Sequence, residues 1–304
     1  MLKTYDIIDG KVQCAEGAEG RILAFFNPDD QEKKYLTVDL KIDEHTLNSS
    51  LDPDELARIE FEPDHLAMIY KRPKNYSAED LLLFRVTSIG LFVFSDRIII
   101  VSSEELPLFE DKRFNKVTSL KDVMLKIFLR SVFHYLEHLK IINMISEDLE
   151  DKINQSMENR YLLNLFTLEK SLVYYLNAIN GNSILLQKLK NYTSKIGFTQ
   201  EEEELLDDLI IENSQCYKQS EIYSNILSGL MDARASIVSN NLNVLMKTLN
   251  IITIGIMVPT FVVSAFSMNV SIPLENNPFA FIIILSLALV SVVAFMLFWR
   301  LKKW

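Results

Sequence analysis

The stretch TFVVSAFSMNVSIPLENNPF (residues 260–279) joins two long uncharged segments near the end of the chain. The first segment covers residues 248–274 and the second covers residues 276–299, and neither contains Asp, Glu, Lys or Arg. A helix of roughly 20 apolar residues crosses a bilayer, so each segment is long enough to do so. The pattern favours two C-terminal transmembrane helices with a short polar turn over a buried hairpin in a soluble protein.

The charges that flank these segments indicate their orientation. Arg300, Lys302 and Lys303 follow the second segment, Lys247 precedes the first, and the turn between them carries no Lys or Arg. Because positive charge stays on the cytoplasmic side, we expect the turn outside and the C-terminus inside. Two spans then return the chain to the same side. The sequence therefore predicts a multi-pass protein of the cell (inner) membrane with both termini in the cytoplasm.

Composition restricts the remaining classes. The 304 residues are 49% hydrophobic, and the formal net charge is -10, with a pI of about 5.0. Such an acidic chain argues against nucleic acid as a partner. Cys14 and Cys216 are isolated, which is typical of reduced thiols in a cytosolic environment. The first ten residues lack the apolar run of a signal peptide, so we expect none.

Residues 1–115 are predicted to form a cytoplasmic α/β domain. Pro53 is predicted to open a short helix, as proline suits the first turn of a helix. The segments LFVF and RIIIV are separated by Ser95 and Asp96, a spacing typical of a β-hairpin. The predicted strands cover residues 21–26, 35–40, 66–70, 91–94 and 97–101.

Residues 116–247 are predicted to form a helical stalk region, and residues 248–304 the membrane domain. Apolar residues at helical spacing predict helices from Ser119 to about residue 155 and from Asn159 to about residue 192. Thr199 and Glu202 fit a capping box at the start of a third helix, with no strong breaker before the membrane. Unbroken, that helix would be about 100 Å long, so it must pack against other helices.

Polar side chains of the first span fall on one helical stripe, which we call the polar seam. Every Asn, Thr and Ser of residues 249–264 lies on it, whereas the rest of this span is apolar, Gly255 or Pro259. Two heptad positions make up the seam: Asn243, Asn250, Met257 and Ser264, and Met246, Thr253 and Thr260. Upstream the same frame collects Asn225, Gly229, Asp232, Ser236 and Ser239.

A polar stripe within a bilayer must face protein or water. It could be contact surface between helices, since Ser and Thr often mediate helix packing in membranes. The length of the seam, with Asn at two levels and Asp232 below, favours a water-filled pore instead. One chain cannot enclose a pore with two spans, so we expect a symmetric ring. Side-chain oxygens and an acidic ring favour cations, and Met257 and Met246 would form apolar constrictions.

The tripeptide SMN (residues 267–269) resembles the Gly-Met-Asn signature of the CorA family of divalent-cation channels. Residues 227–261 are similar to the stalk and pore helix of that family, and the whole chain fits its layout. The resemblance implies an α+β cytoplasmic domain, a long stalk helix and two transmembrane helices in a funnel-shaped homopentamer. It implies that Mg²⁺ is the transported ion, with Co²⁺ or Ni²⁺ as further substrates, and that hydrated Mg²⁺ meets the signature residues Ser267, Met268 and Asn269 at the outer mouth. The positions that match the pore lining are Ser264, Thr260, Met257, Asn250, Leu249, Met246, Asn243 and Asp232, and the seam adds Thr253.

The family also binds regulatory Mg²⁺ between subunits in its cytoplasmic part. Asp208, together with Asp207, occupies the matching position, and carboxylates from two subunits repel unless a divalent ion bridges them. The alternative is a solvated acidic face, which also suits the first turns of a helix.

One departure from the family pattern leaves other functions open. Ser267 stands where the family has Gly, and ZntB-like branches with altered signatures handle Zn²⁺ or other transition metals. A non-conducting, membrane-tethered metal sensor is a further alternative.

His134 and His138 are four residues apart and could share a Zn²⁺ ion, although two histidines without a third ligand are more often surface residues. No phosphate loop or nucleophile motif supports an enzyme.

Overall fold

The computed structural model describes residues 1–15, 20–77, 80–155, 158–268 and 277–302. It divides into two compact units, Met1–Met231 and Asp232–Trp304. The long helix α6 (Gln200–Ala265) contributes its first part to one unit and its second part to the other.

The first unit is built on one seven-stranded sheet with the order β2-β1-β3-β7-β6-β5-β4. The pair β3–β7 is parallel, and the other neighbours are antiparallel. The strands are β1 (Leu2–Ile8), β2 (Lys11–Cys14), β3 (Ile22–Phe26), β4 (Arg58–Phe61), β5 (His65–Pro73), β6 (Val86–Phe94) and β7 (Ile98–Ser102). The predicted strands at residues 21–26 and 66–70 and the hairpin are confirmed: β6 and β7 pair directly, and the Phe94 amide donates to the Arg97 carbonyl at 2.9 Å.

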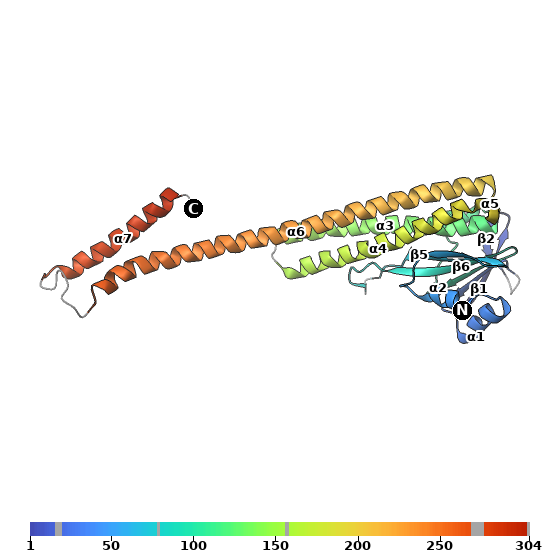
Figure 1. The fold of residues 1–304 in the computed structure, drawn as a ribbon, viewed down its shortest axis with the longest axis horizontal. Helices are drawn as coiled ribbons and strands as arrows, with labels where there is room; N and C mark the ends of the chain where they lie inside the picture. Colours follow the sequence, from blue (N-terminus) through green and yellow to red (C-terminus); the bar gives the residue numbers. More distant parts are fainter. Residues whose placement is uncertain (16–19, 78–79, 156–157, 269–276, 303–304) are drawn as a thin grey trace. The chain divides into compact units, whose positions relative to one another are not determined.

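Helices cover both faces of this sheet (Figure 1). In β3, Ile22, Ala24 and Phe26 point into a large core that also contains α3 (Leu120–Gln155), α4 (Asn159–Asn191) and the first part of α6. The alternate residues of the strand point the other way, into a smaller core beneath α2 (Glu44–Leu51). Since both faces of β3 are buried, its sequence is apolar throughout instead of alternating.

The long helices begin where the sequence places their caps. The Asp122 amide donates to the Ser119 hydroxyl at 3.0 Å at the start of α3. At the start of α6, the Glu202 amide donates to the Thr199 hydroxyl at 3.3 Å, and the Thr199 amide donates to the Glu202 carboxylate at 2.8 Å. This confirms the predicted capping box. The short helical elements are α1 (Asp30–Lys34), the π-helix η1 (Tyr35–Asp39), the 3₁₀-helix η3 (Lys112–Asn115) and α5 (Thr193–Ile196).

The predicted strand at residues 35–40 is wrong, because this segment continues a helix. Asp29 and Glu32 form a capping box that starts α1, and the chain passes directly into η1. Leu36 is fully buried in the smaller core. The β-branched residues favoured a strand, but the upstream cap and the burial of one leucine outweigh that preference.

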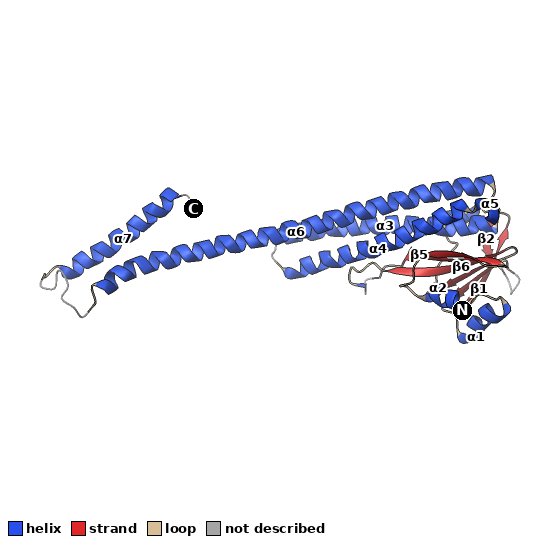
Figure 2. Ribbon diagram, in the orientation of Figure 1, coloured by secondary structure: helices blue, strands red, loops and turns tan. Residues whose placement is uncertain are grey.

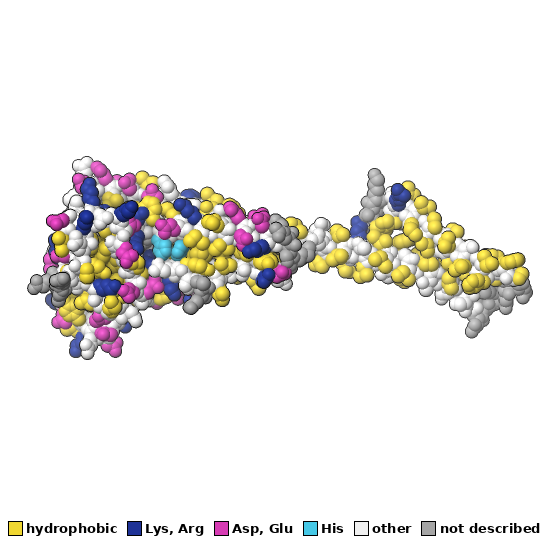
Figure 3. Space-filling view, turned by 180° about the vertical axis from the view of Figure 1, so that it is seen from behind, with side chains coloured by type: hydrophobic (Ala, Val, Ile, Leu, Met, Phe, Trp, Pro, Cys, Tyr) yellow, Lys and Arg dark blue, Asp and Glu magenta, His cyan; other side chains and the backbone are white. Residues whose placement is uncertain are grey.

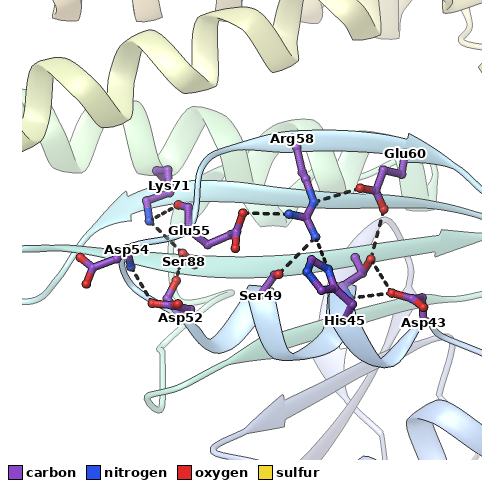
Figure 4. A network of polar contacts seen from close by, with 11 residues as sticks. Asp43, His45, Ser49, Asp52, Asp54, Glu55, Arg58, Glu60, Lys71 and Ser88 are labelled. Carbon is purple, nitrogen blue, oxygen red and sulfur yellow. Dashed lines mark hydrogen bonds and ion pairs between the residues drawn. The ribbon is translucent and has the colours of Figure 1, made fainter.

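The helix predicted to open at Pro53 is also wrong, because side chains from the sheet bind the carbonyls of this segment (Figure 4). The buried Lys71 ammonium donates to the carbonyls of Pro53 at 2.6 Å and Glu55 at 2.8 Å, and to the Ser88 hydroxyl at 2.9 Å. Burial lowers the pKa of Lys71 to about 8, against the opposing effects of Asp54, Asp52 and Glu55. At these carbonyls the Lys71 ammonium takes the place that helical amide donors would have.

One buried amide joins α4 to the sheet. The Asn182 side chain accepts a hydrogen bond from the Lys71 backbone amide at 2.9 Å and donates to the Lys71 carbonyl at 2.7 Å. The last β4 partner on this side of β5 is Arg58, opposite Ile69. Asn182 therefore takes over the edge of β5 just beyond the end of β4.

The second unit consists of helices in its described part, namely the rest of α6 and α7 (Ala280–Lys302) (Figure 2). By length and composition, α6 and α7 are both apolar enough to cross a membrane. The visible face of this unit is mostly hydrophobic (Figure 3). Pro259 lies inside α6.

Candidate ion-conducting surface

The polar seam lies on an exposed face of α6. Its members are all exposed in the single chain, and Met246 and Met257 expose 57% and 62% of their surface. The candidate pore-lining residues within α6 are all exposed: Asp232, Asn243, Met246, Leu249, Asn250, Thr253, Met257, Thr260 and Ser264. The structure thus brings these residues together as one continuous surface along the helix.

The second apolar helix covers a different face of α6. Half-buried residues there recur at Ile251, Gly255, Val258 and Val262, and a Cβ on Gly255 would lie 3.8 Å from the Phe295 ring of α7. At 100° per residue, this face lies on the opposite side of the helix from the seam. The seam is therefore not packed against the second helix of its own chain.

Threonine hydroxyls on the seam are already used as donors. The Thr253 hydroxyl donates to the Leu249 carbonyl at 2.8 Å, and the Thr260 hydroxyl donates to the Ile256 carbonyl at 2.7 Å. A hydroxyl has one proton and two lone pairs, so each oxygen offers only acceptor capacity to its surroundings. This arrangement suits cations and the water molecules bound to them. The sequence identified the residue type but could not show the direction of the hydroxyl proton.

The signature tripeptide is described in part. Ser267 and Met268 are exposed, just beyond the end of α6. Asn269, which the sequence analysis placed at the mouth of the pore, lies outside the described residues.

The two candidate regulatory acids differ in their surroundings. The Asp207 carboxylate forms an ion pair with the Lys190 ammonium of α4 at 2.8 Å. Asp208 is the next residue of α6, and both aspartates are exposed. Among the described residues of the single chain, no three His, Cys, Asp or Glu side chains gather into a possible metal site. A divalent ion at Asp208 would therefore need ligands from elsewhere.

The two histidines differ in burial: His138 is buried, whereas His134 is half-buried, and histidine side chains are visible on the face drawn in Figure 3. His138 is 5% exposed, and its Nδ1 lies 2.5 Å from the Tyr175 hydroxyl oxygen. Burial lowers the pKa of His138 to about 4, with Arg72 adding to the effect. Burial, followed by His138, Arg72 and Arg130, lowers the pKa of His134 to about 3. His138 therefore contributes to the packing between α3 and α4, whereas His134 stays partly exposed.

Comparisons with known proteins agree with this architecture. Residues 18–303 match the family model described as CorA-like Mg2+ transporter protein. The chain is 28% identical over 294 residues to the cobalt/magnesium transport protein CorA of Methanocaldococcus jannaschii, covering 92% of this chain and 89% of that protein.

Solved structures show the same fold. The complete CorA magnesium transporter from Methanocaldococcus jannaschii aligns with a TM-score of 0.82 at 23% identity over 98% of this chain and 96% of that chain. Full-length CmaX aligns with a TM-score of 0.72 at 15% identity, over 99% and 97% of the two chains. The ZntB cytoplasmic domain from Vibrio parahaemolyticus aligns with a TM-score of 0.62 at 12% identity, over 78% and 98%.

The family match extends over nearly the whole chain, including the α+β unit, the long helix and the C-terminal apolar helix. Its members are ion transporters and not enzymes. With the exposed polar seam, these findings have one conclusion: the chain belongs to the CorA-like Mg²⁺ transporter family.

Proposed function

We propose that five copies of this chain form a ring in which the α6 helices enclose an aqueous pore for Mg²⁺, with Co²⁺ and Ni²⁺ as further substrates. The observation that carries the proposal is the exposure of the whole polar seam on the side of α6 opposite α7. Hydrocarbon cannot satisfy amide and hydroxyl groups, so such a surface needs water or other protein. A closed symmetric ring supplies both.

The chemistry of the seam supports a divalent cation as the cargo. Mg²⁺ dehydrates reluctantly and keeps several waters when bound. Those waters donate hydrogen bonds, and the oxygens of Asn243, Asn250, Thr253 and Thr260 can accept them. Asp232 adds a ring of negative charge. Met246, Leu249 and Met257 would narrow the passage enough to close it by dewetting.

Orientation and regulation complete the proposal. The basic residues near both helices support a topology with the two termini in the cytoplasm and the signature, with Asn269, at the outer mouth. Cytoplasmic Mg²⁺ bound between subunits at Asp208 would hold the ring closed, because the ion screens carboxylates that otherwise repel each other. Asp207 has a lysine partner within its own chain, which makes Asp208 the better ligand of the two.

The test is divalent-cation flux into liposomes that contain the purified full-length protein. Asn243→Ala, on the seam, should lower Mg²⁺ flux about tenfold, the effect of about 1.4 kcal/mol. Asn241→Ala, two residues away on the opposite side of the same helix, is the matched control and should leave flux unchanged. Equal flux through both variants, or no flux through the wild type, would contradict the proposed pore.

Ser267 supports a second candidate, transport of Zn²⁺ or another transition metal, since this position departs from the Gly-Met-Asn pattern. Competition among Mg²⁺, Co²⁺, Ni²⁺ and Zn²⁺ in the same liposomes separates the two. Uptake of Zn²⁺ that Mg²⁺ does not inhibit would favour the ZntB-like alternative. Metal binding without any flux would favour a tethered sensor.

A further inference from the structure

A pocket of about 340 Å³ lies in the first unit, where three parts of the fold meet. Its walls come from β5 and β6, from the segment that links β7 to α3, and from the side of α3. Three arginines line it: Arg72 of β5, Arg113 of η3 and Arg130 of α3. His134, four residues after Arg130 on the same side of α3, lines it as well.

Arg130 carries a charge for which the described part of the chain provides no ion pair. Its guanidinium group donates to the backbone carbonyls of Pro107 and Leu108, which are neutral acceptors. Burial lowers the pKa of Arg130, although nearby carboxylates oppose this shift. A charge that is partly withdrawn from water and has no charged partner favours the binding of an anion.

The other two arginines are paired but keep free donors. Arg72 is buried and forms an ion pair with Glu104 at 2.7 Å, and Arg113 forms one with Asp111 at 3.0 Å. The Arg113 guanidinium also lies 4.1 Å from the centre of the Phe133 ring, a contact that fixes its plane. A guanidinium group has five N–H donors, so each of the two can donate to a further acceptor.

The carboxylates of the pocket lie nearer to water than its arginines. The lining contains three carboxylates and three guanidinium groups, but Glu110 and Glu137 are exposed, whereas Arg72 is buried. Water and salt screen exposed charges more strongly than buried ones, so the positive charge dominates in the interior. The half-buried His134 ring responds to it: after burial and His138, two arginines of the region lower its pKa.

We infer that this pocket binds a small oxyanion, a carboxylate or a phosphate group, through Arg130 and the free donors of Arg72 and Arg113. The planar fork of a guanidinium group matches two oxygens of either anion. The volume is near the lower end for small-molecule sites, so the ligand is a compact one. The inference is separate from the proposed pore, because every residue of this pocket belongs to the first unit.

The experiment is calorimetric titration of the purified full-length protein in detergent with pyrophosphate and with citrate, at constant ionic strength and without divalent cations. At least one of the two should bind to the wild type, and the tighter one identifies the anion as a phosphate or a carboxylate. Arg130→Gln should weaken that binding about 10- to 100-fold, as expected for lost charge-assisted hydrogen bonds. Arg130→Lys keeps the charge but loses the fork, and should weaken it about 3- to 10-fold. Binding of neither anion to the wild type overturns the inference.

Because Arg130 also holds two carbonyls, a second variant separates binding from folding. Arg113→Gln should weaken binding about 3- to 10-fold, and near-ultraviolet circular dichroism checks that each variant is folded. Arg97→Gln is the matched control, since Arg97 is half-buried and paired with Asp96 at the β6–β7 turn, outside the pocket. It should bind like the wild type. Wild-type affinity in both Arg130→Gln and Arg113→Gln, or an equal loss in Arg97→Gln, overturns the inference.

Discussion

The two parts of α6 show opposite burial. Up to Met231, the helix buries Leu206, Leu209, Cys216 and Leu227 against the sheet unit. Beyond it, large apolar residues such as Phe261, at 75% exposure, are uncovered, and no described residue of α6 is buried. The first part is thus packed inside the first unit, whereas the second part has an apolar surface that is long enough to cross a membrane. One continuous helix therefore contributes to two units with different surfaces.

Tyrosine and tryptophan allow the two units to be followed separately. All 11 tyrosines lie within Met1–Met231, and both tryptophans lie within Asp232–Trp304. Tyr70, Tyr135 and Tyr175 are fully buried. Near-ultraviolet circular dichroism of tyrosine therefore reports on the first unit, and tryptophan fluorescence reports on the second.

The largest expected effect comes from removing a leucine from the protein core. Leu209→Ala should lower the free energy of unfolding of the first unit by about 2–5 kcal/mol, because the fully buried side chain leaves a cavity. Leu289→Ala in α7, which is 68% exposed, is the matched control and should change it by about 0.5 kcal/mol or less. Denaturation in detergent, followed by the tyrosine signal, measures both. Equal losses would break the contrast between the two units.

A smaller effect is expected on acidification. The pKa values of His134 and His138, about 3 and about 4, lie below the value of 6.5 for the unfolded chain. Between those pH limits the unfolded chain binds more protons than the folded chain. The free energy of unfolding is therefore largest above pH 6.5 and falls as the pH drops toward 4. We expect a loss of about 1–2 kcal/mol between pH 6.5 and pH 5, after allowing for partial solvent screening.

The pH dependence of the tyrosine signal under denaturant measures this loss. His134→Gln should make the decline shallower, because one of the two groups that resist protonation is gone. His45→Gln, on the exposed side of α2, is the matched control. A decline of the same slope in His134→Gln would show that the histidine pair does not cause it.

The smallest expected effect is on Mg²⁺ flux and comes from a threonine of the polar seam. Thr253→Val keeps the shape of the side chain but removes its acceptor oxygen, and Mg²⁺ flux should fall about 2- to 5-fold. Thr248→Val is the matched control, since its hydroxyl makes the same bond, to the Val244 carbonyl at 2.9 Å, on the opposite side of the helix. Flux assays in liposomes compare the two. Similar losses of flux in both variants would mean that the lost hydrogen bond to the helix, and not the lost oxygen on the seam, lowers the flux.

Features that depend on neighbouring residues were predictable from the sequence. The long helices, the capping box of Thr199 and Glu202 and the β6–β7 hairpin follow from spacing and residue type. Features that depend on distant residues were not. The segment after Pro53 is held by Lys71, and His138 is buried against Tyr175, 37 residues away. Lys71 gave one signal, because it and Arg72 are charged residues that directly follow the apolar run at residues 66–70 of β5.

The Asn182 amide has a mechanical consequence for the first unit. To shift α4 along β5 by a single residue, two buried hydrogen bonds would have to break together, with no water at hand to replace them. Slippage at this contact is therefore costly, whereas rotation of the sheet and α4 as one rigid body is not. The sheet and α4 are therefore expected to move together at this contact.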